Sequence, residues 1–193
     1  MTKNRQTKET PVAALAGNPN VGKSTIFNAL TGMRQHTGNW PGKTVSLAQG
    51  VCMYKGEEIR LVDLPGTYAL VSKSQEETLA AGFISGGEAD CVIAVCDATS
   101  LERSLILALQ VMELTDRVIV CVNLMDEAQK QGIEIDLAAL SFELGVPVVA
   151  ASASREEGMG ELLEQLRRIL DGFEEPRPRR LGVIDASVRG TQA

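Results

Sequence analysis

The residues whose types and spacing most clearly indicate a chemical function are two glycines, a lysine and a serine near the start of the chain. They lie in the sequence GNPNVGKS, which matches the pattern GxxxxGK[ST]. In such a loop the backbone N–H groups and the start of the next helix face phosphate groups. The lysine reaches the β- and γ-phosphates, and the serine hydroxyl binds Mg²⁺. The pattern predicts a nucleoside triphosphate site formed by Gly17, Asn18, Pro19, Asn20, Val21, Gly22, Lys23, Ser24 and Thr25.

A second segment that could take part in the chemistry is Asp63-Leu64-Pro65-Gly66, which follows an apolar run. The aspartate stands where a Mg²⁺ ligand acting through water is expected, and the glycine N–H can approach the γ-phosphate. Many GTPases carry a glutamine after this glycine to orient the attacking water. This chain has Thr67 there. Either hydrolysis is very slow, or another group does that work.

Two further segments predict recognition of guanine. The carboxylate of Asp126 can accept two hydrogen bonds from the N1–H and 2-amino edge of guanine, which adenine lacks. We expect Asn123 to brace the base pocket and the phosphate loop. The usual guanine motif has lysine second, where this chain has leucine. A later SAS segment fits a loop that supports the base. The predicted set is Asn123, Leu124, Met125, Asp126, Ser152, Ala153 and Ser154.

The segment 33–44 contains Gly, Pro and Asn, lacks a period and is predicted to be a loop. A nucleotide switch needs a loop hydroxyl that binds Mg²⁺ when the γ-phosphate is present. Thr37 and Thr44 are both candidates for that hydroxyl. We also include Gly42 and Lys43 among the residues expected to contact nucleotide.

The elements that must position these segments alternate between strands and helices. Such alternation predicts βαβ units, a mainly parallel sheet with helices on both faces, and ligands beyond the carboxyl ends of the strands. The pair Lys55-Gly56 predicts a hairpin that adds one antiparallel edge strand. The expected class is an α/β fold of the P-loop GTPase (Ras-like) type with six strands. The predicted strands are 12–16, 45–54, 59–62, 91–96, 118–122 and 147–150, and the helices are 23–32, 74–84, 101–114, 136–144 and 158–170.

Composition limits the other possibilities. The chain has 193 residues, which is typical of one domain. Its net charge is −6, with the acidic excess in the middle of the chain, so we expect no nucleic-acid partner. No apolar run approaches the ~18–20 residues that span a bilayer. No CxxC motif is present, and reduced core thiols are expected at Cys52, Cys91, Cys96 and Cys121.

We expect three regions along the chain. Residues 1–10 are predicted to be a loose N-terminus, and residues 11–173 a GTP-binding G domain. Residues 174–193, with two prolines and the basic run 177–180, are predicted to be a loose tail.

The motifs, taken in order, resemble one family, the cytosolic G domain of the bacterial ferrous-iron transport protein B (FeoB). The resemblance rests on GNPNVGKSTIFNALTG, GNWPGKTVS, LVDLPGTYAL, the segment from Asp97 to Leu114, and VNLMD, and it covers about residues 12–170. An apolar second residue in NLMD is a habit of this family. The resemblance implies a GTPase with Mg²⁺ that regulates ferrous-iron uptake from the cytoplasmic face of the inner membrane.

The resemblance also implies stimulation by potassium. Asn20 matches the K⁺-ligating residue of the family, and backbone carbonyls around Gly38 and Trp40 would complete the cage. The ion then stands where an arginine finger would, which explains hydrolysis without a glutamine. Thr44 matches the Mg²⁺-binding threonine of the first switch, which favours it over Thr37. The implied catalytic residues are Asn20, Lys23, Thr44 and Gly66.

The family has a helical domain and a membrane portion after the G domain. Only a short segment follows Leu170, so we expect both parts to be absent here and the membrane iron-transport portion to be the missing partner. Two alternatives stay open. One is a nucleotide-state switch with incidental hydrolysis, which Thr67 supports. The other is a soluble ribosome-assembly GTPase, against which the acidic core and the GNWPG segment argue.

Overall fold

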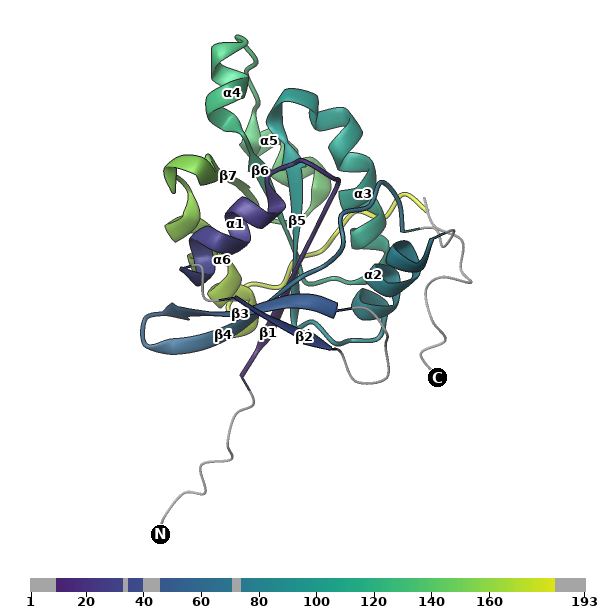
Figure 1. Cartoon of the computed structure of the whole chain (residues 1–193). Coiled ribbons are helices and arrows are strands. Elements are labelled where there is room, and N and C mark those ends of the chain that lie inside the picture. Colours follow the sequence, from purple (N-terminus) through teal and green to yellow (C-terminus); the bar gives the residue numbers. More distant parts are fainter. Residues whose placement is uncertain (1–9, 33–34, 40–45, 71–73, 183–193) are drawn as a thin grey trace.

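The central feature is a seven-stranded sheet between two layers of helices (Figure 1). The computed structural model describes residues 10–32, 35–39, 46–70 and 74–182. The strand order is β2-β3-β4-β1-β5-β6-β7, so the loop after β1 leaves the middle of the sheet. The strands are β1 (Val12–Gly17), β2 (Gln35–Asn39), β3 (Ser46–Tyr54), β4 (Glu57–Asp63), β5 (Cys91–Asp97), β6 (Val118–Asn123) and β7 (Val148–Ala150).

The strand directions confirm the predicted, mainly parallel sheet. β1 pairs in parallel with β4 and β5, and β6 pairs in parallel with β5 and β7. β3 runs antiparallel to β4, as the hairpin signal predicted. Lys55 and Gly56 between them both have positive φ, 51° and 83°. All six predicted strands are present.

The predicted loop over 33–44 was wrong for its central part. Gln35–Asn39 forms β2, which pairs antiparallel with β3. Therefore β2, and not β3, is the strand at this edge of the sheet. The segment QHTGN has no apolar alternation that would mark a strand. It forms a strand because the edge of β3 offers unpaired backbone groups.

Helices cover both faces, as predicted (Figure 1). Successive residues of β1 alternate between the faces. Ala13 and Leu15 pack with α1 and α6, whereas Ala14 and Ala16 pack on the side of α2, α3 and α5. Because both faces are buried, the parallel strands are nearly continuous apolar runs. The helices are α1 (Lys23–Thr31), α2 (Gln75–Ser85), α3 (Leu101–Leu114), α4 (Met125–Lys130), α5 (Leu137–Leu144) and α6 (Met159–Leu170).

Helix α4 was not predicted. It has six residues, which is too short to show a hydrophobic period. It begins after Leu124, whose φ of 64° turns the chain sharply at the end of β6. Asp126 and Glu127 lie in its first turn and Lys130 in its last, which suits the helix dipole. The short helix therefore places Asp126 directly beyond the sheet.

The four cysteines are buried and free, as predicted. Burial raises the pKa of Cys52 to about 11 and those of Cys91 and Cys96 to about 12. Burial also raises the pKa of Cys121 far above its ordinary value. All four thiols are therefore protonated at neutral pH and are poor nucleophiles.

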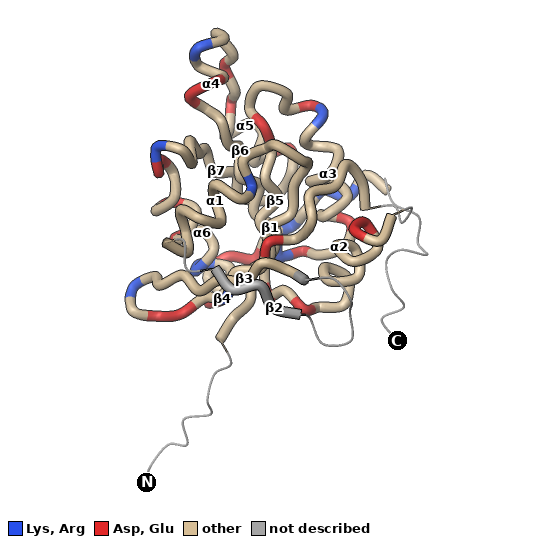
Figure 2. The backbone as a smooth tube through the Cα atoms, in the orientation of Figure 1, with Lys and Arg blue, Asp and Glu red and all other residues tan. Residues whose placement is uncertain are grey.

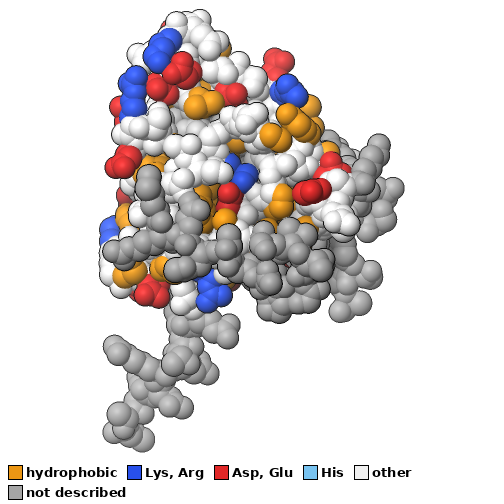
Figure 3. Space-filling view, in the orientation of Figure 1, with side chains coloured by type: hydrophobic (Ala, Val, Ile, Leu, Met, Phe, Trp, Pro, Cys, Tyr) orange, Lys and Arg blue, Asp and Glu red, His pale blue; other side chains and the backbone are white. Residues whose placement is uncertain are grey.

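Basic and acidic residues are scattered along the described chain (Figure 2). On the face shown in Figure 3, acidic and basic side chains of the described residues are interspersed. A surface that holds a nucleic-acid backbone instead gathers basic side chains on one face. Within the described ranges, no helix has the length and apolar character needed to cross a bilayer.

The segment 174–182 is not loose, in contrast to the prediction for the tail. The backbone N–H of Arg177 donates to the carbonyl of Gly145 at 2.9 Å. The guanidinium of Arg180 pairs with Asp116 at 2.6 Å. These bonds tie the segment across the ends of α5 and α3. Residues 1–9 and 183–193 of the predicted loose ends lie outside the described residues.

The docking of this segment yields a stability prediction at Gly145. Its φ is 72°, and an added Cβ would collide with the carbonyl oxygen of Arg177. Gly145→Ala should therefore lower the free energy of unfolding by the left-handed backbone penalty, about 1–2 kcal/mol, and by about 1 kcal/mol more for the disturbed hydrogen bond. Gly132→Ala is the matched control, because Gly132 has φ 70° with open space around it. Equal losses of stability in urea for the two variants would contradict this account of the segment.

Candidate nucleotide-binding site

The phosphate loop connects β1 to α1 at the middle of the sheet. Its last glycine, Gly22, has φ 80° and caps α1, so the chain turns directly into the helix. An added Cβ at Gly22 would collide with the side-chain amide of Asn123, and one at Gly17 would lie 2.9 Å from the carbonyl oxygen of Val95. Both positions thus need glycine. A cavity of about 550 Å³ lies over the loop and is lined by Asn18, Pro19, Asn20, Gly22, Lys23, Ser24, Thr25 and Gly66.

Lys23 and Ser24 both meet Asp63 at the end of β4. The ammonium of Lys23, which is mostly buried, forms an ion pair with one carboxylate oxygen of Asp63. The hydroxyl of Ser24 donates to the other oxygen at 3.3 Å. The structure therefore brings together the three side chains that the two phosphate-site motifs single out.

The segment after Asp63 lies against the phosphate loop. The N–H of Thr67 donates to the carbonyl of Gly17 at 3.3 Å. A Cβ on Gly66 would lie 3.4 Å from the backbone of Pro19. The hydroxyl of Thr67 is directed to its own turn, donating to the carbonyl of Ala69 at 2.7 Å. Because this hydrogen bond occupies its hydroxyl, Thr67 does not replace a water-orienting glutamine.

Helix α3 holds the continuation of this segment, which the sequence analysis did not foresee. The N–H of Leu70 donates to the side-chain amide oxygen of Gln110 at 2.7 Å. The guanidinium of Arg103 lies 4.9 Å from the ring centre of Tyr68, in a cation–π contact. Arg103 thus contacts Tyr68, which lies two residues after Gly66.

Asn123 joins the base pocket to the phosphate loop, as its motif predicted. Its side-chain N–H donates to the carbonyl of Val21 at 3.0 Å, and its oxygen accepts from the N–H of Ala153 at 3.0 Å. The residue is almost fully buried. One amide therefore fixes the phosphate loop and the segment 152–154 relative to each other.

Asp126 lies in the first turn of α4, next to the segment 152–154. Its backbone N–H donates to the hydroxyl of Ser152 at 3.2 Å. One carboxylate oxygen, Oδ1, is shut off from solvent and has no hydrogen-bond partner among the described residues. The other, Oδ2, lies 3.3 Å from Nε of Arg155. Arg155 was missed by the sequence analysis, because a single arginine after SAS carries no pattern.

The other predicted site residues lie either outside the described residues or away from β1. Gly42, Lys43, Thr44 and Trp40 lie outside the described residues. Gly38 lies in β2, with β3 and β4 between it and β1. At about 4.8 Å per strand, that places its backbone about 14 Å from β1. The predicted cage with Asn20 also involves Trp40, which lies outside the described residues, so the cage stays a prediction.

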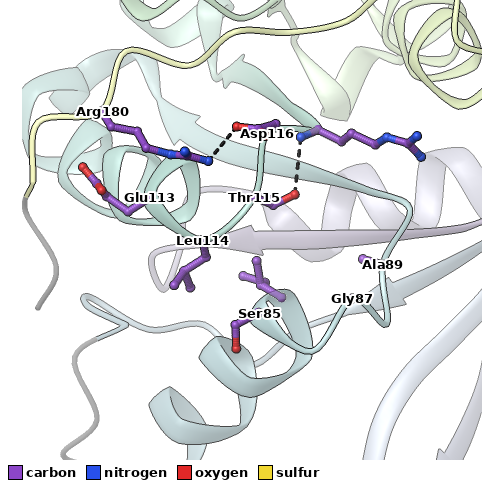
Figure 4. A pocket seen from close by; sticks show the side chains of 10 residues that line it. Ser85, Gly87, Ala89, Glu113, Leu114, Thr115, Asp116 and Arg180 are labelled. Atoms are coloured by element: carbon purple, nitrogen blue, oxygen red, sulfur yellow. Dashed lines mark hydrogen bonds and ion pairs between the residues drawn. The ribbon is translucent and has the colours of Figure 1, made fainter. Parts of the chain in front are cut away.

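A second cavity, of about 630 Å³, lies at the opposite end of the sheet (Figure 4). It is bordered by the ends of α2 and α3 and by Arg180 of the docked segment. None of the predicted site residues lines it. No cluster of three or more His, Cys, Asp or Glu side chains suited to a metal ion occurs within the described part of the chain.

Comparison with known proteins decides the family. The model of the family described as "Ferrous iron transport protein B" matches residues 11–166. The chain belongs to the FeoB family. "Fe(2+) transporter FeoB" of Escherichia coli (strain K12) is 44% identical over 163 residues, which are 82% of this chain and 21% of that protein. The Salmonella typhimurium relative is 47% identical over 152 residues, or 77% of this chain and 20% of that protein. The chain thus spans about a fifth of the length of these curated relatives.

Solved structures confirm the P-loop GTPase fold of a FeoB G domain. The cytosolic domain of T. maritima FeoB in a GDP form has a TM-score of 0.83 and 43% identity, covering 89% of this chain and 67% of that one. Its GMPPNP form has a TM-score of 0.83 and 42% identity, covering 92% and 69%. The T. maritima G domain alone has a TM-score of 0.77 and 45% identity, covering 83% and 98%.

The position of Asn123 predicts a large structural effect for its removal. Asn123→Ala would leave the carbonyl of Val21 and the N–H of Ala153 unpaired in a buried place. The free energy of unfolding should fall by about 2–4 kcal/mol, since each unsatisfied buried group costs about 1–3 kcal/mol. Asn20→Ala is the control, because Asn20 is exposed on the phosphate loop. Denaturant unfolding that gives the same value for both variants would refute the bracing role.

Proposed function

We propose that this FeoB G domain binds GTP and GDP and hydrolyses GTP. The observation that supports the proposal is that the predicted motifs meet at the carboxyl ends of the parallel strands. The phosphate loop lines a cavity of about 550 Å³, Asp63 lies beside Lys23 and Ser24, and Asn123 links this cavity to the loop beside Asp126. This arrangement supports a phosphate site in the cavity and a base site beside Asp126, with Asn123 linking the two segments.

The guanine preference rests on the unpaired oxygen of Asp126. An unpaired buried carboxylate oxygen is costly, which favours a ligand that brings hydrogen-bond donors; because Oδ1 is shut off from solvent, the carboxylate would have to turn to present it to the base. The guanine edge carries two donors side by side, whereas adenine presents no matching pair. Leu124 and Met125 lie beside Asp126 and are partly exposed, so the base would meet an apolar surface next to one acidic group.

Magnesium fits the side chains beside the phosphate loop. Mg²⁺ prefers oxygen ligands, and the hydroxyl of Ser24 and the carboxylate of Asp63 lie 3.3 Å apart. We assign Ser24 as a direct ligand and Asp63 as a ligand through water, with Thr44 as a third. When bound, the ion supplies positive charge to the β- and γ-phosphates. Lys23 would then exchange its ion pair with Asp63 for the phosphates, and the N–H of Gly66 would approach the γ-phosphate.

The wider role that we propose is regulation of ferrous-iron uptake across the bacterial inner membrane. It rests on the FeoB relatives, which are described as Fe(2+) transporters and are about four times as long as this chain. The G domain would then act at the cytoplasmic face, on a membrane portion of the same protein. A switch with incidental hydrolysis is the second candidate, and the local hydrogen bond of Thr67 favours it.

Guanine recognition is tested at Asp126. Asp126→Ala should weaken GTP and GDP binding by at least ~2 kcal/mol, because hydrogen bonds to a charged group are lost. ATP binding, already weak, should change little. Calorimetric titration with each nucleotide measures this difference. A wild-type domain that bound ATP as tightly as GTP would exclude the assignment.

Potassium stimulation is tested at Asn20, which is exposed and has φ 68°, so that its amide oxygen is available to a cation. Turnover of GTP in potassium should exceed that in sodium by about tenfold or more, below the 10³–10⁵ of an arginine finger. Asn20→Ala should abolish the difference and largely keep nucleotide binding. Thr67→Ala is the control and should keep the potassium response, because its hydroxyl faces its own turn. A response that survived in Asn20→Ala would rule out this ion site, and equal rates in both salts would favour the switch.

A further inference from the structure

The remaining unexplained feature of the base pocket is Arg155. It lies in the short 3₁₀ turn Ala153–Arg155, directly after the predicted base-supporting loop. Its side chain is 52% exposed, whereas that of Asp126 is 9% exposed. An exposed arginine is normally free to point into solvent. Here its Nε lies 3.3 Å from Oδ2 of the carboxylate that is expected to recognise guanine.

The backbone on both sides fixes the two residues close together. The N–H of Met125 donates to the carbonyl of Ala151 at 3.1 Å, and the N–H of Asp126 donates to the hydroxyl of Ser152. The N–H of Arg155 donates to the carbonyl of Ser152 at 2.9 Å. The start of α4 and the 3₁₀ turn are thus tied to one another through Ser152, which is buried. The ion pair therefore lies on a rigid frame.

The guanidinium of Arg155 resembles the edge of the guanine base that Asp126 is expected to bind. The N1–C2–N2 edge of guanine is itself a guanidine-like group, with adjacent N–H donors in one plane. The side chain of arginine carries the same arrangement as a cation and matches carboxylates well. In this structure Arg155 occupies one oxygen of Asp126, and the other oxygen stays unpaired and shut off from solvent.

We propose that Arg155 is a specificity-determining residue that competes with the guanine edge for Asp126. This inference rests on the proposed binding of guanine nucleotides. Guanine has two donors and needs both carboxylate oxygens, so its binding displaces Arg155 from Oδ2. A base with a single donor needs one oxygen, which the carboxylate would present by turning Oδ1 towards the base, and it leaves Arg155 on the other oxygen. The arginine therefore reduces the advantage of guanine over a base that lacks the 2-amino group.

Inosine diphosphate provides that single-donor probe, because hypoxanthine has the N1–H of guanine but no 2-amino group. The quantity to measure is the ratio of Kd for IDP to Kd for GDP, by calorimetric titration in Mg²⁺ buffer. A change in net charge near the phosphates affects both nucleotides alike and cancels in this ratio. Loss of the Arg155 pair should raise the ratio about 1.4- to fivefold, since exposed ion pairs contribute about 0.2–1 kcal/mol.

Two variants separate competition from packing. Arg155→Ala removes the side chain, and Arg155→Met keeps an unbranched chain without donors, so both should raise the ratio. Both variants leave the carboxylate of Asp126, which is 9% exposed, without its cation, so both should unfold at a lower temperature than the wild-type domain and are titrated well below that temperature. Arg168→Ala is the matched control, because Arg168 is 50% exposed and its ion pair is with Glu174, at 2.9 Å. Its ratio should equal that of the wild-type domain.

The outcomes distinguish the inference from the function on which it rests. A raised ratio in both Arg155 variants, with Arg168→Ala unchanged, supports competition. An unchanged or lowered ratio overturns it, and a lowered ratio would mean that Arg155 holds Asp126 in place to accept from the 2-amino group. Wild-type protein that binds ADP as tightly as GDP would instead refute guanine recognition itself. That failure would be visible before any Arg155 variant was measured.

Discussion

The side-chain amide of Asn123 is the interaction on which the site depends. It donates to the phosphate loop at Val21 and accepts from Ala153 in the segment beside the base pocket. A nucleotide is a molecule of fixed length between base and phosphates, so a protein that binds it must hold two loops at a fixed separation. These loops follow β1 and β7, which lie three strands apart in the sheet. No backbone ladder joins them directly, and a buried side chain with one donor and one acceptor does so.

That amide also explains the glycine at position 22. A Cβ there would occupy the space of the Asn123 amide, and the positive φ of Gly22 is unfavourable for other residues. The requirement for glycine in the phosphate loop therefore has two sources. One is the approach of phosphates to the backbone, and the other is the approach of Asn123 from behind. The contact with Asn123 therefore fixes the shape of the phosphate loop in the absence of a ligand.

The sequence allowed most of the fold and the linear motifs to be predicted, because both depend on local patterns. Strand β1 and its neighbours in the sheet are nearly continuous apolar runs. The polar residues that follow them meet beyond the carboxyl ends of the strands, because the strands are parallel. The features that were missed depend on distant backbone groups. β2 pairs with the edge of β3 through main-chain bonds that no side-chain pattern records. The segment 174–182 is held in the same way, by the carbonyl of Gly145 among others. The pairing of Arg155 with Asp126 needs a turn and a helix from different parts of the chain, so neither residue alone could indicate it.

The charged groups of the site are paired with each other in ways that a ligand must undo. Lys23 pairs with Asp63, and Arg155 pairs with Asp126. In each case a cation of the chain stands beside a carboxylate that is assigned to metal or base. Such pairs keep buried charges from being isolated, which would be strongly destabilising. They also lower the net gain when a nucleotide binds, because the ligand replaces an existing interaction instead of filling an empty one. Asn18 and Asp126 each keep one buried oxygen without a partner among the described residues. The pairing is therefore incomplete both at the phosphate loop and beside the segment 152–154. Under the proposed recognition of guanine, the donors of the base would add at Asp126 a hydrogen bond that the protein does not make for itself.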